Sequence, residues 1–253
     1  MPAGNKPEAA VRTIAGGRSP QAIVPSSTAS QLARLHALKD HLEDIIDSWT
    51  SIAPPGSARR SARGTSAASS PGPRLGIVVG HTAKAPGGSG LASAGPSEYL
   101  WNKDLAEKIK TAGAAAGIEV GIFLRDGIGI AGAYRELADW GAAAAIELHY
   151  NNHDGSVRGT ETLWGPACPK SEAWATAIQA AMVALYNRTG KQNRGLKQAP
   201  PFDGGRDSVN ALSTIPSCLI EPFFGDNPDD VALGGANKTR LAEALVSVFV
   251  ARF

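Results

Sequence analysis

From residue 75 onward the chain alternates short apolar runs with longer segments of helical pattern, and this alternation constrains the fold more than any other feature. Apolar runs predict buried strands at 75–80, 118–124, 144–149, 159–164 and 217–222. Helical patterns occupy 97–116, 131–142, 171–188 and 231–253. Such alternation predicts an α/β fold, in which a single twisted and mostly parallel sheet is covered by helices on both faces.

The first 73 residues lack this alternation and divide into three segments. Residues 1–27 are predicted to be disordered, and residues 53–73, rich in Ser, Gly, Pro, Ala and Arg, are predicted to be a flexible linker. Between them, residues 28–52 carry apolar side chains at heptad spacing: Leu35, Leu38, Leu42, Ile45, Trp49 and Ile52. This spacing predicts an amphipathic helix that docks on itself, on a carrier protein or on its own folded domain. That domain is predicted to span residues 74–253.

Charge and hydropathy argue against two classes of partner. The formal net charge is only +2, so no strong positive field would hold the chain on nucleic acid. No apolar run reaches the length of a membrane span, and residues 1–17 lack the continuous apolar core of a Sec signal peptide. We therefore expect synthesis in the cytoplasm and delivery by another route. The two cysteines, Cys168 and Cys218, are too few to indicate a disulfide framework, and their pairing stays open.

Three potential metal ligands occur at the ends of predicted elements. His81 follows the first strand, Glu98 opens the first helix, and His149 ends the third strand. Each has an ordinary explanation when taken alone, such as favourable helix-end electrostatics for Glu98. Together, however, two imidazoles and one carboxylate form the ligand set of catalytic zinc sites that keep one coordination position open.

Three further polar residues accompany this set. Glu221 lies in the apolar run 218–224, where desolvation requires either a partner or a raised pKa suited to acid–base chemistry. Glu147 points the same way as His149 because side chains alternate along a strand, so it would either orient that histidine or compete as a ligand. His153, in a turn-like segment, is a second rival ligand.

Eight short motifs, in one order, together resemble a known family. They are Val78-Val79-Gly80-His81, the segments 97–102 and 123–126, Arg135 with Glu136, and the segments 147–151, 159–162, 193–197 and 215–221. In that order they resemble the zinc-dependent N-acetylmuramoyl-L-alanine amidases of the Amidase_3 type, including the strand ending in Gly-His and the Arg-Gly-x-Lys turn. Two departures are Val78-Val79 where the family often has Asp-Pro, and Pro222-Phe223-Phe224 in place of Gly-Phe.

The resemblance implies a fold, a cofactor and a reaction. By resemblance, His81, Glu98 and His149 bind one Zn²⁺ per chain, and Glu221 is the catalytic carboxylate. The substrate would be peptidoglycan, cleaved at the amide between N-acetylmuramic acid and L-alanine. Two alternatives are a zinc peptidase acting within stem peptides and a wall-binding module without turnover. A phage endolysin and a tail-associated or effector lysin are the settings that we expect for a chain without a signal peptide.

Overall fold

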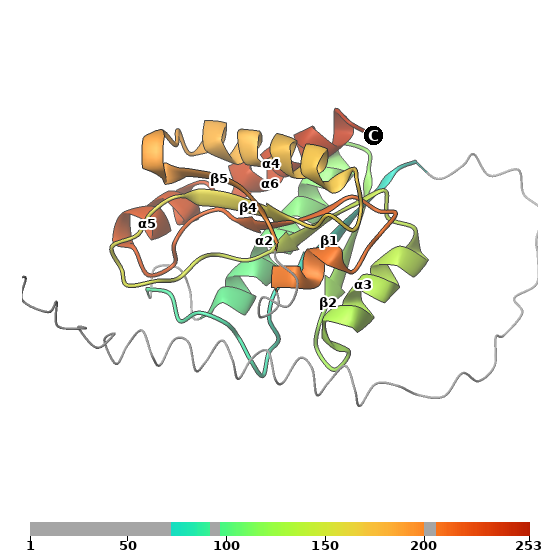
Figure 1. The fold of residues 1–253 in the computed structure, drawn as a ribbon, viewed down its shortest axis with the longest axis horizontal. Helices are drawn as coiled ribbons and strands as arrows, with labels where there is room; N and C mark the ends of the chain where they lie inside the picture. The colour runs from blue at the N-terminus through green and yellow to red at the C-terminus, as the bar shows by residue number, and fades with distance from the viewer. Residues whose placement is uncertain (1–71, 92–96, 200–205) are drawn as a thin grey trace, which may run out of the picture.

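The computed structural model describes residues 72–91, 97–199 and 206–253, and Figure 1 shows their arrangement. The predicted disordered segment, the predicted amphipathic helix and nearly all of the predicted linker lie outside these residues. The elements in chain order are β1 (Arg74–Val79), α2 (Glu98–Ala115), β2 (Glu119–Leu124), α3 (Gly129–Trp140), β3 (Ala144–Leu148), β4 (Thr160–Trp164), α4 (Ser171–Leu185), η2 (Gly190–Gln192), β5 (Asn193–Gln198), η3 (Arg206–Asn210), β6 (Ser217–Glu221), α5 (Pro228–Ala236) and α6 (Lys238–Val250).

All six strands form one sheet in the order β2-β1-β3-β6-β4-β5. Pairing is parallel between β1 and each of its neighbours, between β3 and β6, and between β4 and β5, whereas β4 and β6 run antiparallel. The predicted single, mostly parallel sheet is therefore confirmed.

Apolar clusters cover both faces of the sheet, and successive residues of β1 enter different clusters. Ile77 and Val79 pack with residues of α2, α4 and α6, whereas Val78 packs with α3. Figure 1 shows α4 and α6 together along one side of the sheet, with α3 on the opposite side. A smaller cluster joins Val209 of η3 to Leu219 of β6 on the α3 side. Because both faces are covered, β1 reads as a continuous apolar run and not as an alternating one.

The carboxyl ends of β1, β3 and β6 meet at one edge of the sheet, since these three neighbouring strands are parallel. The register pairs Val79 with Leu148, and Leu148 with Ile220. Residues that follow β1 and β3, and the last residue of β6, are thereby brought side by side. In open α/β sheets, sites form at such strand ends.

The structure differs from the sequence prediction in two elements. Residues 193–197, predicted to be a turn, belong to strand β5, whose residues are all at least partly exposed and so give no apolar pattern. The predicted closing helix at 231–253 is instead two helices, α5 and α6, separated at Asn237. The Asn237 side chain donates a hydrogen bond back to the Leu233 carbonyl, which satisfies the end of α5.

Two remaining expectations concern cysteines and membranes. Cys168 and Cys218 are both buried and both free thiols, so they do not form a disulfide with each other. In the described part of the chain, no helix combines the length and apolar character needed to cross a membrane.

Candidate metal centre

Three side chains that are distant in sequence converge at the carboxyl edge of the sheet. Glu98 Oε2 lies 3.1 Å from His81 Nε2, and Glu98 Oε1 lies 2.9 Å from His149 Nδ1. One donor atom from each of the three residues lies within 4.8 Å of the other two. The two imidazole rings meet edge to face, with their centroids 4.8 Å apart. The structure thus brings together the three residues that the sequence singled out as metal ligands.

The backbone after β1 is shaped to admit both histidines. His81 has a φ of 67°, a left-handed conformation that is rare and costs free energy for a residue other than glycine. The preceding Gly80 donates its backbone N–H to the Leu148 carbonyl, which holds this turn against the end of β3. A Cβ atom at position 80 would stand only 2.4 Å from His149 Nε2, so only glycine fits there.

Glu98 is fixed by the start of α2. The Ser97 hydroxyl accepts a hydrogen bond from the Leu100 backbone N–H and caps the helix. Backbone N–H groups of Gly88 and Tyr150 donate to Oε2 and Oε1 of Glu98, each at 3.0 Å. Burial by itself would raise the pKa of Glu98, but the neighbouring His81 and His149 outweigh burial and lower that pKa well below its ordinary value. The carboxylate is therefore ionised, as a metal ligand must be.

His149 contacts a different carboxylate through its other ring nitrogen. Its Nε2 lies 3.0 Å from Glu147 Oε1, on the opposite side of the ring from Glu98. Glu147 is fully buried, and Oε2 accepts hydrogen bonds from the hydroxyl groups of Tyr134 and Ser208. The buried Arg125 guanidinium forms an ion pair with Oε1 of Glu147. These four partners hold Glu147 behind His149 and away from the other two residues of the cluster.

Glu221 and His153 lie outside the three-residue cluster. Glu221 ends β6 and is 5% exposed. The His149 backbone N–H donates to the Ile220 carbonyl, so the β3–β6 register continues and places Glu221 beside His149 on the same face of the sheet. His153 is exposed and its backbone N–H donates to Asp226, in a loop. It is not part of the cluster, so the structure does not support it as a rival ligand.

The donor set of the cluster fits zinc. Two imidazole nitrogens and one carboxylate oxygen are the protein ligands of many catalytic zinc sites. With metal–ligand bonds of about 2.0–2.1 Å, neighbouring donors of a tetrahedral site lie roughly 3.3 Å apart. The separations of 2.9 and 3.1 Å at Glu98 involve its two different oxygens, and one donor atom from each residue lies within 4.8 Å of the other two, so an ion would draw the three donors closer together. The residues present therefore match the group that the sequence predicts.

Tyr134 and Ser208 take part in this site without having been predicted from the sequence. They come from α3 and η3, and only the folded sheet brings their hydroxyl groups to Glu147. An isolated tyrosine or serine in a helical segment carries no sequence signal for such a role. Arg125 lies within the motif at 123–126, which carries no sequence signal for its contact with Glu147.

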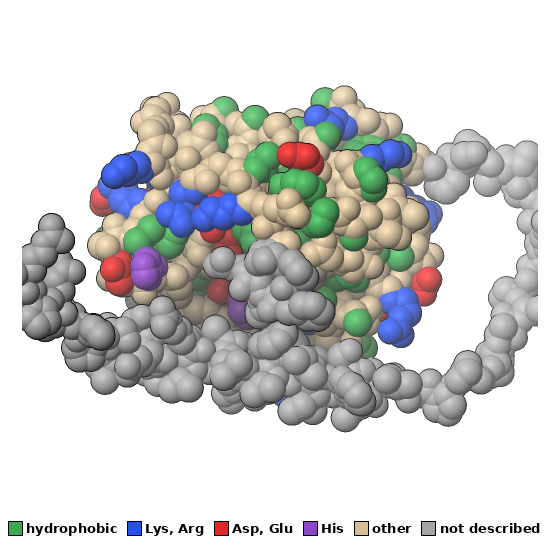
Figure 2. Space-filling model, in the orientation of Figure 1, with side chains coloured by type: hydrophobic (Ala, Val, Ile, Leu, Met, Phe, Trp, Pro, Cys, Tyr) green, Lys and Arg blue, Asp and Glu red, His purple; other side chains and the backbone are tan. Residues whose placement is uncertain are grey.

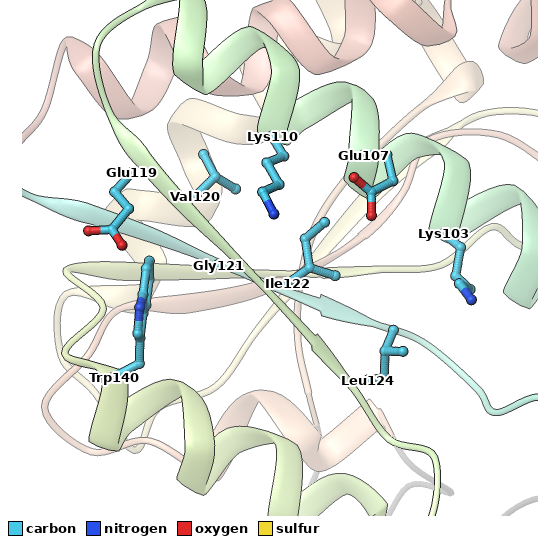
Figure 3. Close-up of a pocket in the computed structure, with 9 residues that line it drawn as sticks. All are labelled: Lys103, Glu107, Lys110, Glu119, Val120, Gly121, Ile122, Leu124 and Trp140. Carbon is cyan, nitrogen blue, oxygen red and sulfur yellow. The ribbon is translucent and has the colours of Figure 1, made fainter.

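A separate pocket of about 590 Å³ lies on the other side of α2, beside the edge strand β2. Figure 3 shows Lys103, Glu107 and Lys110 above it and Trp140 at one end. It shares no residue with the histidine–glutamate cluster and contains no histidine or cysteine. The potential metal ligands lie at the strand ends and not in this pocket, so the candidate site is at the strand ends.

Comparisons with known structures agree with the fold. A catalytic domain of an N-acetylmuramoyl-L-alanine amidase from Bacillus (Paenibacillus) polymyxa var. colistinus superimposes with a TM-score of 0.60 at 21% identity, covering 71% of this chain and 97% of that one. An N-acetylmuramoyl-L-alanine amidase of Nostoc punctiforme gives 0.58 at 20% identity, covering 71% and 96%. The catalytic domain of an endolysin targeting Clostridia difficile gives 0.54 at 24%, covering 70% and 97%. At these identities the likeness shows a shared fold. No curated protein sequence matches the chain.

A family match is found at the level of sequence as well. A family model described as N-acetylmuramoyl-L-alanine amidase matches residues 75–247, from β1 into α6. This match spans more than half of the 253 residues and includes the histidine–glutamate cluster and Glu221. The chain belongs to the N-acetylmuramoyl-L-alanine amidase family.

Proposed function

We propose that this chain is a zinc-dependent hydrolase that cleaves the amide between the lactyl group of N-acetylmuramic acid and L-alanine in peptidoglycan. The observation that carries the proposal is the convergence of His81, Glu98 and His149 at the edge where Glu221 ends the adjoining strand. Such an arrangement supplies a metal-binding face and a separate carboxylate next to it. In the hydrolysis of an unactivated amide the carbonyl must be polarised and a proton must reach the leaving amine, and these two kinds of group can supply both functions.

One zinc ion per chain is proposed to bind to His81, Glu98 and His149. When bound, zinc supplies Lewis acidity that polarises a carbonyl and acidifies a water molecule. The protein fixes these ligands in advance through the Gly80 turn and through the backbone N–H groups that hold Glu98. Preorganised ligands of this kind need little rearrangement at the moment of reaction.

Glu221 is proposed to move the proton. Its carboxylate lies beside His149 without belonging to the ligand cluster, and its low exposure keeps bulk water from competing for the proton. It would accept a proton from the attacking water and return it to the L-alanine nitrogen, so that the amine leaves in neutral form.

Glu147 is proposed to position His149. When Nε2–H of His149 donates to Glu147 Oε1, the lone pair of Nδ1 is directed toward the cluster. Glu147 is unsuited to be a ligand itself, because its second oxygen is occupied by the hydroxyl groups of Tyr134 and Ser208. These contacts favour the orienting role over the competing role as a ligand.

The catalytic region is proposed to be residues 74–253, with the preceding segments serving attachment or delivery to the wall. Strand β1 begins at Arg74, and the ligands, Glu221 and the core all lie beyond it. Release as a phage endolysin and delivery as a tail-associated or effector lysin remain the two proposed routes.

Digestion of purified peptidoglycan tests the proposal. The zinc-loaded chain should release stem peptides with a new L-alanine amino terminus, identified by mass spectrometry. Glu221→Gln should retain zinc and its melting temperature while turnover falls by about 10²–10⁴-fold, the usual contribution of general acid–base catalysis. New termini within the stem peptide would instead identify a peptidase. Binding to the wall without any new terminus would identify a non-catalytic module.

A further inference from the structure

A cationic pair on β5 lies next to the site and has no role in the proposed chemistry. Arg194 Nε lies 2.6 Å from Glu161 Oε2, and Lys197 Nζ lies 2.7 Å from the same oxygen. Glu161 is 1% exposed, and its other oxygen accepts a hydrogen bond from the Asn151 side chain. Figure 2 shows Lys and Arg side chains gathered over the β4–β5 side of the molecule.

An irregularity in the sheet turns both cations to the same face. Residues three apart on a regular strand point to opposite faces, so Arg194 and Lys197 could not both reach Glu161 from an unbroken strand. The β4–β5 register, however, shifts between Thr160 and Glu161, and Gly195 has a φ of +74°. This bulge adds one residue to β5, which restores the two side chains to one face.

The group formed by Arg194, Lys197 and Glu161 has two positive charges and one carboxylate to balance them. Within the described residues, the ion pairs of Arg194 and Lys197 are both made to Glu161. Burial would raise the pKa of Glu161, but the hydrogen bonds from Lys197, Arg194 and Asn151 outweigh it and lower that pKa. Glu161 is therefore ionised, and two cations share one negative charge. Their side chains are 28% and 41% exposed, so a ligand can reach them from solvent.

Sheet pairing sets this surplus charge close to the proposed proton-transfer group. Glu161 on β4 is the direct antiparallel partner of Glu221 on β6. The Cβ atoms of such partners lie about 5 Å apart and point to the same face. The cations and Glu221 thus lie on one face of the sheet, with Glu161 between them.

We propose that Arg194 and Lys197 together bind a free carboxylate of the peptidoglycan stem peptide, an inference that rests on the proposed function. In peptidoglycan, L-alanine is followed by D-glutamate joined through its side chain, so the α-carboxylate next to the scissile amide can be free. Two residues of extended chain span at most about 7 Å, so this carboxylate stays close to the scissile amide. A guanidinium and an ammonium held side by side suit one carboxylate better than its neutral amide.

The experiment compares two muramoyl peptides that differ only at this group, one with the free α-carboxylate and one with the carboxamide. Full-length, zinc-loaded protein carrying Glu221→Gln serves for calorimetric binding, and protein with Glu221 intact serves for kinetics. We expect about tenfold tighter binding of the carboxylate form, corresponding to one charge-assisted hydrogen bond. Arg194→Gln and Lys197→Met should each remove most of this preference and raise KM for the carboxylate substrate alone. Lys197→Arg, which keeps the positive charge, should retain the preference for the carboxylate peptide.

Lys191→Met is the matched control, because it removes one positive charge from an exposed residue of the adjacent η2 and leaves the Glu161 cluster intact. It should leave the preference unchanged. Equal binding of the two peptides by protein with Arg194 and Lys197 intact would overturn the inference. An equal loss of the preference in Lys191→Met would overturn it as well. If binding shows the preference while neither peptide is cleaved, the proposed function fails and the carboxylate site stands. If both peptides are cleaved without a preference, the proposed function stands and the carboxylate site fails.

Discussion

At the scale of single residues, His149 has a different partner at each ring nitrogen. Nδ1 faces Glu98 within the cluster, and Nε2 faces the buried Glu147 outside it. The protein thereby separates a carboxylate within the histidine–glutamate cluster from a second carboxylate on the other side of the ring. Hydrogen bonding at the second nitrogen of a metal-binding histidine also raises the basicity of the first.

Substitution of the imidazoles should abolish metal binding. His81→Ala and His149→Ala each remove one of three protein ligands, so we expect zinc content to fall from about one ion per chain to near zero after dialysis. Atomic absorption on the dialysed proteins measures this. His153→Ala, which changes an exposed histidine outside the cluster, should keep the full content. Retained zinc in both ligand variants would refute the assignment.

Glu147→Gln should weaken zinc binding without removing a ligand. We expect about 10–100-fold lower affinity, the range found when groups that orient metal ligands are changed. Competition with a chelator measures the affinity, and the ¹⁵N shifts of His149 report which ring nitrogen carries the proton. Glu136→Gln changes an exposed glutamate of α3 and should leave both readings unchanged. Unaltered affinity and unaltered shifts in Glu147→Gln would exclude the positioning role.

The sequence revealed the residues of the site that occupy element ends. His81, Glu98, His149 and Glu221 each follow, open or close a predicted element, and a local pattern locates such positions. Tyr134 and Ser208 could not be found in this way, because their contacts with Glu147 depend on how α3 and η3 pack on the sheet. Local periodicity carries no information about those long-range contacts.

At the scale of elements, the sequence predicts strands that are rich in apolar residues, including the edge strand β2, but not the polar edge strand β5. β1 and β3 are continuous apolar runs in the middle of the sheet. β5 is an edge strand with the sequence NRGLKQ, whose polar residues and glycine resemble those of a turn. The antiparallel pairing of β4 with β6 likewise has no local signature, because it depends on chain topology.

Asp230 in α5 contacts the segments that adjoin β4, β6 and α4, and this gives a prediction at the scale of elements. Its fully buried carboxylate accepts from the backbone N–H groups of Gly159 and Phe224, and forms an ion pair with Arg188 at 2.8 Å. Asp230→Ala would leave the buried Arg188 charge without this partner. We expect the free energy of unfolding to fall by about 3–5 kcal/mol, measured by urea denaturation.

The neighbouring Asp229 provides the control for Asp230. Its side chain is 70% exposed and pairs with Arg158 at the surface. Asp229→Ala should therefore change the free energy of unfolding by less than about 1 kcal/mol. Similar losses in the two variants would show that Asp230 acts through general helix-end electrostatics and not through its buried contacts.

At the scale of the whole molecule, the described fold contains its own core and site. The main apolar cluster runs from Leu75 in β1 to Phe249 in α6, and a second cluster joins the sheet to α3 on the opposite face. Residues 72–253 should accordingly fold with a cooperative thermal transition and cleave solubilised peptidoglycan at about the rate of the full chain. Circular dichroism and a soluble-substrate assay measure both properties. Insoluble or inactive protein would mean that the preceding residues complete the core.

The two buried thiols have a consequence for where this fold can exist. Cys168 and Cys218 are 1% and 0% exposed and unpaired, and burial raises the pKa of the Cys218 thiol well above its ordinary value. A buried thiol that stays protonated reacts slowly with oxidants. A fold without disulfides has no such bond that a reducing agent could break. The native structure therefore contains no Cys168–Cys218 disulfide that a reducing cell interior could break. An enzyme of this design needs no oxidative maturation between its synthesis and the wall on which it acts.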